Sequence, residues 1–266
     1  MTELPVILVT GASSGIGEAA VRVFAREGYR VAMAARRLDR LQALAQEIQA
    51  TGGTALPIAA DLTKLEDIQN MVNCTLEEFG QIDVLLNNAG YGRLDWLENL
   101  DPVKDIEGQL RINLVAVIQT AREVLPHMIA RRSGHIINMA SMAGLSATPT
   151  YTIYAASKFG VRGFTEALRR EVGVFGIHVS ALYPGAVKTE FGEHTGAHRK
   201  TGWTTPAALR LSAEDVAQAA LSVVKRPRRM LVFPWPMKIG VWANALFPGL
   251  ADWIIERNFT RPERGL

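Results

Sequence analysis

The sequence has very little cysteine, since Cys74 is the single one among 266 residues. One cysteine excludes an intramolecular disulfide framework and a cysteine-rich zinc site, and we expect no metal site. An excess of one charge is also missing, because 29 Lys and Arg stand against 26 Asp and Glu. The net charge of +3 gives no reason to expect nucleic acid as a partner. No apolar signal segment follows Met1, so we expect no secretory signal and a cytoplasmic location.

Short runs rich in Val, Ile and Leu alternate with longer stretches of helical periodicity along most of the chain. This alternation predicts the α/β class: a Rossmann-type, doubly wound parallel sheet of about seven strands with helices on both faces, in a single domain. The expected strands are Val6–Thr10, Arg30–Ala35, Ala55–Ala59, Val84–Asn87, His135–Ala140, His178–Leu182 and Met230–Phe233. The expected helices are Gly15–Glu27, Asp39–Ala50, Leu65–Phe79, Val103–Ala130, Tyr154–Phe175 and Ala213–Val224.

Two segments depart from this alternation, one within a single predicted domain of residues 1–233 and one after it. Residues 185–210 are rich in Gly, Thr and His without clear periodicity, which is typical of a substrate-binding loop. Residues 234–266 form an apolar and aromatic C-terminal extension, with one helical face running from Ile239 to Ile254. A membrane-spanning helix needs about 20 uninterrupted apolar residues. We expect no membrane partner, because the extension is interrupted at Lys238, Pro248 and Asp252.

A glycine-rich turn follows the first expected strand, in the run Thr10-Gly11-Ala12-Ser13-Ser14-Gly15-Ile16-Gly17. Gly11 permits a tight turn, Gly15 lets the backbone approach a pyrophosphate, and Gly17 lets the helix pack closely on the strand. The first amides of the helix and its positive dipole end favour an anion. Because the glycines follow a strand and open a helix, they predict dinucleotide binding.

The second expected strand ends in Ala35-Arg36-Arg37, without the acidic residue that usually holds the ribose of NAD. A guanidinium offers planar, paired donors to a 2′-phosphate, which a carboxylate at that place would repel. Arg36, and with less reason Arg37, therefore predict NADP(H) as the preferred cofactor, with NAD(H) as the alternative.

A tyrosine and a lysine stand four residues apart at the start of a predicted helix, in Tyr154-Ala155-Ala156-Ser157-Lys158. That spacing places both side chains on one helical face. A free phenol has a pKa of about 10, and a nearby ammonium lowers it toward the range useful for catalysis. Ser141 follows another strand, from which its hydroxyl can reach a substrate carbonyl. This group predicts acid–base chemistry at a carbonyl.

Together these motifs resemble an ordinary-length short-chain dehydrogenase/reductase, over nearly all of residues 4 to 233. The resemblance rests on the glycine turn, on Asn87-Asn88-Ala89-Gly90, on Ser141 with Tyr154 and Lys158, and on the run from Pro184 to Thr189. It implies an oxidoreductase that interconverts a ketone or aldehyde and an alcohol on a mainly apolar small molecule. Members of the family are commonly dimers or tetramers, so a homodimer or homotetramer is expected.

The resemblance also assigns roles to individual residues. Tyr154 is implied to be the acid, Ser141 to orient the carbonyl, Lys158 to bind the nicotinamide ribose, and Asn113 to hold a water in a proton relay. On the cofactor, Asp61 corresponds to the adenine contact, Arg36 to the 2′-phosphate ligand and Thr189 to the carboxamide contact. Ser14 stands where some NADP-binding members have a basic residue. The remaining implied cofactor contacts are Gly11, Ser13, Gly15, Ile16, Gly17, Arg37, Leu62, Asn88, Ala89, Gly90, Pro184, Gly185 and Val187.

Several other hypotheses stay open at this point. Tyr151 stands seven residues before Lys158, a spacing used by a divergent enoyl-reductase branch, although the glycine turn follows the ordinary pattern. Reduction of a 3-oxoacyl thioester is a second alternative, and a membrane-surface-associated steroid- or retinoid-type dehydrogenase is a third. A cofactor-sensing regulator without turnover would not need Ser141, Tyr154, Lys158 and Asn113 together. For the pocket, we expect Met142, Ala143, Leu145, Thr148 and the segments Tyr91–Trp96 and Phe191–Trp203 to form walls.

Overall fold

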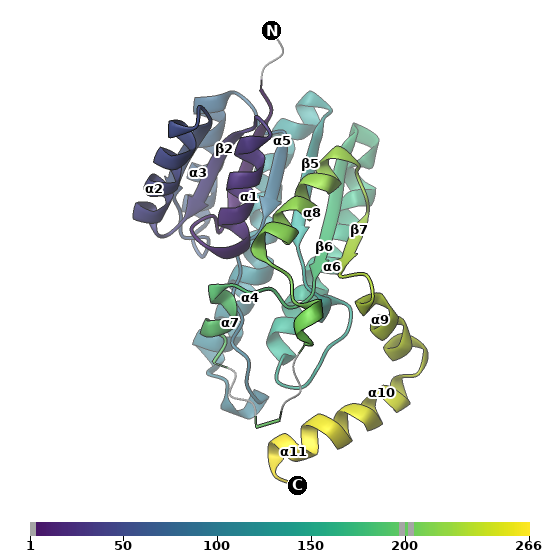
Figure 1. Ribbon diagram of the computed structural model, residues 1–266. Helices are drawn as coiled ribbons and strands as arrows, with labels where there is room; N and C mark the ends of the chain where they lie inside the picture. Colours follow the sequence, from purple (N-terminus) through teal and green to yellow (C-terminus); the bar gives the residue numbers. More distant parts are fainter. Residues whose placement is uncertain (1–3, 197–199, 202–204) are drawn as a thin grey trace.

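Seven strands form one parallel sheet in the computed structural model, which describes residues 4–196, 200–201 and 205–266 (Figure 1). The strand order is β3-β2-β1-β4-β5-β6-β7, and every neighbouring pair is parallel. The predicted fold class is therefore confirmed. The strands are β1 Val6–Thr10, β2 Arg30–Ala35, β3 Thr54–Ala59, β4 Val84–Asn87, β5 Gly134–Met139, β6 Ile177–Pro184 and β7 Met230–Phe233.

The sheet is buried on both faces because its strands are apolar at successive positions. In β1, Ile7 and Val9 point into one core cluster, whereas Val6 and Leu8 point into the other. The first cluster packs against α1 (Gly15–Arg26), α2 (Leu38–Ala50) and α8 (Ala213–Lys225). The second packs against α3 (Leu65–Phe79), α5 (Ala116–Arg131) and α6 (Thr152–Val172). Continuous apolar strands between two helix layers are typical of parallel sheets.

The predicted helix over Val103–Ala130 exists, but it is not uniformly α-helical. Two π-helical turns, Pro102–Glu107 and Arg111–Val115, flank α4 (Gly108–Leu110) and precede α5. Such turns occur often at functional sites. Shorter helical segments are α7 Glu190–His194 and 3₁₀ turns at Leu97–Asn99, Met142–Gly144, Gly173–Phe175 and Ala207–Leu209.

The order of the strands reverses at β1, whose two neighbours are β2 and β4. In open parallel sheets, ligands bind at such a switch point, outside the carboxyl ends of the strands. The glycine turn, the Asn88 segment, Ser141 and the segment after Pro184 all follow strand ends at this edge. The topology therefore gathers the predicted site residues on one side of the sheet.

After β7 the chain leaves the sheet and continues as a series of helices that extends away from it (Figure 1). These are α9 Met237–Leu246, α10 Pro248–Ile255, a π-helical turn Glu256–Thr260 and α11 Arg261–Arg264. The predicted interruption at Pro248 is confirmed. Trp235, Trp242 and Trp253 are more than half exposed on the outer side of this extension. None of the helices in the described residues has the length and apolar composition to cross a membrane.

Candidate active site

A cavity of about 2170 Å³ opens at the carboxyl edge of the sheet. Its walls include the glycine turn, the ends of β2, β4 and β5, the start of α6 and the segment that follows β6. Of the predicted site residues, all line this cavity except Gly17 and Asn113, which lie behind its wall. The fold therefore brings together predicted site residues that are up to about 180 positions apart along the chain, from Gly11 to Thr189.

The glycine turn can adopt its path only because its key positions lack a side chain. Gly11 and Gly15 have φ angles of +67° and +57°, in the left-handed region that favours glycine. A Cβ on Gly11 would lie 2.8 Å from the Cα of Ala89, and a Cβ on Gly17 would lie 2.2 Å from the Gly11 carbonyl oxygen. The first amides of α1 therefore face an open groove, which fits a pyrophosphate at a helix N-terminus.

The ends of β1 and β4 are joined by side chains beneath this groove. The Thr10 hydroxyl oxygen accepts hydrogen bonds from the amides of Asn88 (3.0 Å) and Ala89 (3.1 Å). The Asn88 amide group in turn donates to the Thr10 carbonyl at 3.0 Å. These bonds fix the Asn88–Gly90 segment beside the glycine turn, where both line the cavity.

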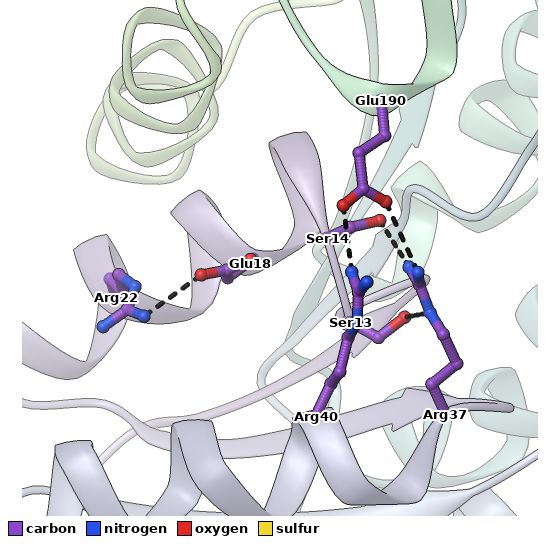
Figure 2. A network of polar contacts seen from close by, with 7 residues as sticks. All are labelled: Ser13, Ser14, Glu18, Arg22, Arg37, Arg40 and Glu190. Atoms are coloured by element: carbon purple, nitrogen blue, oxygen red, sulfur yellow. Dashed lines mark hydrogen bonds and ion pairs between the residues drawn. The ribbon is translucent and has the colours of Figure 1, made fainter. Parts of the chain in front are cut away.

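The two arginines at the end of β2 face different partners. Arg36 is exposed at the cavity wall near Asp61, whose pKa is lowered by hydrogen bonds from Thr63 and also by the Arg36 charge. Arg37 instead donates to the hydroxyls of Ser13 (3.2 Å) and Ser14 (2.8 Å) (Figure 2). Both guanidinium groups therefore lie on the side of the groove that the sequence assigns to the adenosine ribose.

Tyr154 and Lys158 lie one turn apart on α6, and both side chains are buried. Ser141 and Tyr154 line the same cavity, and the Ser141 hydroxyl is close enough to the Tyr154 phenol to lower its pKa. Ser141 accepts a hydrogen bond from the Ala143 amide at 3.2 Å. The Lys158 ammonium lies 5.7 Å from the centre of the Tyr154 ring and donates to the Met139 carbonyl at 2.9 Å. The three predicted catalytic side chains thus meet at the end of β5.

The expected lowering of the tyrosine pKa is wrong for this structure. Burial raises the pKa of Tyr154 to about 12, against a smaller lowering by the Ser141 hydroxyl. Burial also lowers the pKa of Lys158 to about 8. The reason is that removing both groups from water disfavours their charged forms, and the ammonium is directed to the Met139 carbonyl rather than to the phenol oxygen.

Asn113 is fully buried in the π-helical turn Arg111–Val115. Its side-chain oxygen accepts from the Tyr91 amide at 2.9 Å, and its amide group donates to the Tyr91 carbonyl (2.8 Å) and to the Ser157 hydroxyl (3.3 Å). Gly90 packs against it, because a Cβ there would lie 2.9 Å from the Asn113 oxygen. Asn113 therefore holds the strand end after β4 against α6, and its predicted role with water stays a prediction.

Comparison with known proteins agrees with this geometry. The chain matches the short-chain dehydrogenase family over residues 5–200. The chain belongs to that family. An uncharacterised oxidoreductase of Listeria innocua is 40% identical over 187 residues, which cover 70% of this chain and 75% of the relative. The prediction of an enzyme of the dehydrogenase/reductase type is therefore confirmed.

Solved short-chain dehydrogenase structures share the fold over most of the chain. One, from Sphingobium yanoikuyae in complex with NADPH, has a TM-score of 0.80 at 29% identity and covers 94% of this chain and 96% of its own. An alcohol dehydrogenase from Thermococcus sibiricus, complexed with 5-hydroxy-NADP, has a TM-score of 0.78 at 29% identity, covering 87% and 96%.

The pocket of this short-chain dehydrogenase differs in part from the expected one. Met142, Ala143 and Thr148 line the cavity as predicted, but Leu145 packs into the cluster beneath β6 and β7 instead. Of the segment Tyr91–Trp96, the first four residues line the cavity and the last two do not. Phe191, Gly192 and Thr195 are wall residues, whereas Trp203 lies outside the described residues.

The C-terminal extension supplies a further wall of the pocket. Val241, Phe247, Leu250 and Ile254 line the cavity. The far end of the extension is attached at Glu263, which accepts from the backbone amides of Lys200 (3.0 Å) and Thr201 (2.7 Å). The Arg264 guanidinium lies 3.7 Å above the Trp96 ring and pairs with Glu98.

Two charged residues at the site were missed by the sequence reasoning. Glu190 begins α7 and pairs with the guanidinium groups of Arg37 (3.4 Å) and Arg40 (3.0 Å) (Figure 2). The signal available in the sequence was an acidic residue directly after Thr189, a predicted cofactor contact. Among the described residues, no three His, Cys, Asp or Glu side chains are grouped as metal ligands.

Proposed function

We propose that this short-chain dehydrogenase is an NADP(H)-dependent oxidoreductase that interconverts a ketone or aldehyde and an alcohol. The observation that supports it most is that the Ser141 hydroxyl and the Tyr154 phenol lie next to each other in a cavity that the glycine turn also lines. A carbonyl oxygen placed at this hydroxyl pair would have both a proton donor and an orienting hydrogen bond within reach.

The raised pKa of Tyr154, about 12, suits an acid in the direction of reduction. The phenol keeps its proton at neutral pH, and an alkoxide oxygen is basic enough to take it. Ser141 holds the carbonyl oxygen toward the phenol. Lys158, buried one turn further along α6, is positioned to bind the nicotinamide ribose and to bring positive charge near the developing phenolate. Asn113 connects this region to the backbone of Tyr91.

Bound NADP(H) would supply or accept the hydride. The residues that would hold it are Gly11, Ser13, Ser14, Gly15 and Ile16 at the pyrophosphate, supported by Gly17 in the helix packing. Arg36 and Arg37 would bind the 2′-phosphate, and Asp61 with Leu62 the adenine. The remaining contacts proposed are Asn88, Ala89, Gly90, Pro184, Gly185, Val187 and Thr189. The preference for NADP(H) over NAD(H) is supported by Arg36 and by the NADP-type ligands of the solved relatives.

The substrate we propose is a mainly apolar small molecule. Met142, Ala143, Phe191, Leu250 and Ile254 supply apolar surface to the cavity around Tyr154. In this assignment residues 1–233 form the cofactor-binding and catalytic domain, residues 185–210 the substrate-binding loop, and residues 234–266 an outer wall.

We also propose a homodimer or homotetramer in the cytoplasm. The exposed tryptophans of the extension support an additional subunit contact, because large apolar patches are uncommon on isolated proteins. The single cysteine suits a reducing compartment.

The test compares Tyr154→Phe with Tyr151→Phe on a panel of ketones, aldehydes and alcohols, followed by NAD(P)H absorbance with both cofactors. Tyr151 is a matched control, because its ring lies 6.2 Å from that of Tyr154 and also lines the cavity. We expect Tyr154→Phe to remove turnover while NADPH binding persists, and Ser141→Ala to lower kcat by about 100-fold. Retained turnover in Tyr154→Phe, with loss in Tyr151→Phe, would transfer the acid role to Tyr151.

A further inference from the structure

A carboxylate from the substrate-binding loop reaches the basic side of the cofactor groove. Glu190 Oε1 lies 3.0 Å from the Arg40 guanidinium, and Glu190 Oε2 lies 3.4 Å from that of Arg37 (Figure 2). The partners are 150 and 153 residues apart in the sequence. The nearby pair of Glu18 and Arg22 on α1 is separate from this group. The contact thus connects the first residue of α7 to the end of β2 and the start of α2.

The residue before Glu190 makes a second connection at the same place. A Cβ added to Gly15 would lie 3.2 Å from the Thr189 methyl carbon, so the Thr189 side chain rests directly against the glycine turn. Residues 189 and 190 therefore cross the groove between Gly15 and Arg37. Both line the same cavity as Ser13, Ser14 and Arg36.

The Arg37 guanidinium has its donors distributed among three acceptors. It donates to the hydroxyls of Ser13 and Ser14 and also pairs with Glu190. Hydrogen bonds from Arg40 and Arg37 keep the pKa of Glu190 below its usual range, so the carboxylate is charged at neutral pH. A phosphate dianion on the ribose would need the same donors, and its charge would repel this carboxylate.

We propose that Glu190 is a positioning residue that competes with the cofactor 2′-phosphate for Arg37, while Arg40 holds the carboxylate beside it. This inference rests on the proposed use of NADP(H) and extends it to the loop. A nucleotide without the 2′-phosphate leaves the pairs of Glu190 intact and the start of α7 tied to α2. A nucleotide with the 2′-phosphate takes the Arg37 guanidinium and repels the Glu190 carboxylate, so cofactor identity changes how α7 is held beside the substrate pocket.

The first test measures binding of adenosine 2′,5′-bisphosphate and of ADP by titration calorimetry to wild type, Glu190→Gln and Asp39→Asn. Asp39 is a matched control, because it is an exposed acid next to Arg40 with no contact to either guanidinium found among the described residues. A solvent-exposed ion pair is worth up to about 1 kcal/mol, which corresponds to about fivefold in Kd. We therefore expect Glu190→Gln to tighten adenosine 2′,5′-bisphosphate about fivefold and leave ADP within about twofold, with Asp39→Asn changing neither.

A second measurement follows the loop itself by hydrogen exchange. The Gly192 amide donates to the Thr189 carbonyl at 3.1 Å, so its exchange reports the integrity of the start of α7. Adenosine 2′,5′-bisphosphate should speed this exchange at least about twofold over ADP in wild type, and the two ligands should act alike in Glu190→Gln.

Three results would overturn the competition. One is an unchanged or weaker Kd of Glu190→Gln for adenosine 2′,5′-bisphosphate, and another is a tightening of both ligands alike. A third is slower Gly192 exchange in wild type with the 2′-phosphate than with ADP. A failure of the proposed cofactor preference gives a result distinct from these three, because wild type would then bind adenosine 2′,5′-bisphosphate and ADP with equal Kd. That result overturns both proposals.

Discussion

Replacing Lys158 by Met should make this protein more stable at pH 7 while removing its activity. Lys158 is 4% exposed, and the hydrogen bond of its ammonium to the Met139 carbonyl does not compensate for the lost hydration, because burial lowers its pKa from 10.5 to about 8. The folded state therefore binds this proton more weakly than the unfolded chain does. Met has a similar length and needs no hydrogen-bond partner, so it fits the same buried path.

The size of the effect follows from the difference in pKa. A folded pKa below the unfolded value means that the cost of the charged lysine is fully present below pH 8 and fades as pH rises toward 10.5. At 1.36 kcal/mol per pKa unit, the cost is about 3 kcal/mol at pH 7 and about 1 kcal/mol at pH 9.5. For a chain of this size, about 3 kcal/mol corresponds to an increase in Tm of about 6 °C.

Urea unfolding of wild type, Lys158→Met and Lys64→Met at pH 7 and pH 9.5 measures this difference. Lys64 is the matched control, because it is an exposed lysine at the start of α3. We expect Lys158→Met alone to raise the free energy of unfolding, with an advantage that shrinks by about half or more at pH 9.5. A variant less stable than wild type at pH 7, or an advantage independent of pH, would refute the reasoning from burial.

Three further outcomes are expected. Arg36→Ala should weaken NADPH by about tenfold or more and NADH little, since a charge-assisted hydrogen bond contributes about 1.5–3 kcal/mol; equal losses in fluorescence titrations would contradict this. Burial lowers the pKa of His135 to about 4, so wild type should lose about 2 kcal/mol of unfolding free energy between pH 7 and pH 5 that His135→Gln does not lose. Glu263→Gln should raise KM for bulky ketones several-fold without changing the cofactor Kd, whereas Glu256→Gln, on the same extension, should leave KM unchanged.

Local pattern was sufficient to predict most of the sheet. The limits of β1, β2, β4 and β7 agree with the expected strands, because each is a compact and largely apolar run. The π-helical turn at Asn113 could not be predicted, since it depends on how that side chain fits between the Tyr91 backbone and Ser157. Hydrophobic periodicity predicts that a segment is helical, but it does not predict at which residue the α-helical turn widens to a π-helical turn.

The part of the site that consists of characteristic residue types directly after strand ends could be predicted from the sequence. Spacing placed Tyr154 and Lys158 together, but it carried no information on burial, so the direction of the tyrosine pKa was wrong. The contacts of Glu190 with Arg37 and Arg40 join segments about 150 residues apart, and no local pattern encodes such a pairing. The anchoring of Glu263 to the backbone of Lys200 and Thr201 was missed for the same reason.

Glu263 and Arg264 attach the end of the C-terminal extension to Lys200, Thr201 and Trp96, and this attachment has a practical consequence. The pocket wall from Val241 to Ile254 follows β7 and is attached at its far end through Glu263, Arg264 and the contact of Phe259 with Trp96, so we expect that it can be replaced as one unit. Grafting extensions of other lengths between Pro234 and Glu263 would resize the pocket while the glycine turn, Ser141 and Tyr154 stay in place. An affinity tag fused after Leu266 would sit two residues from the Arg264 contact with Trp96, so purification tags belong at the other end of the chain.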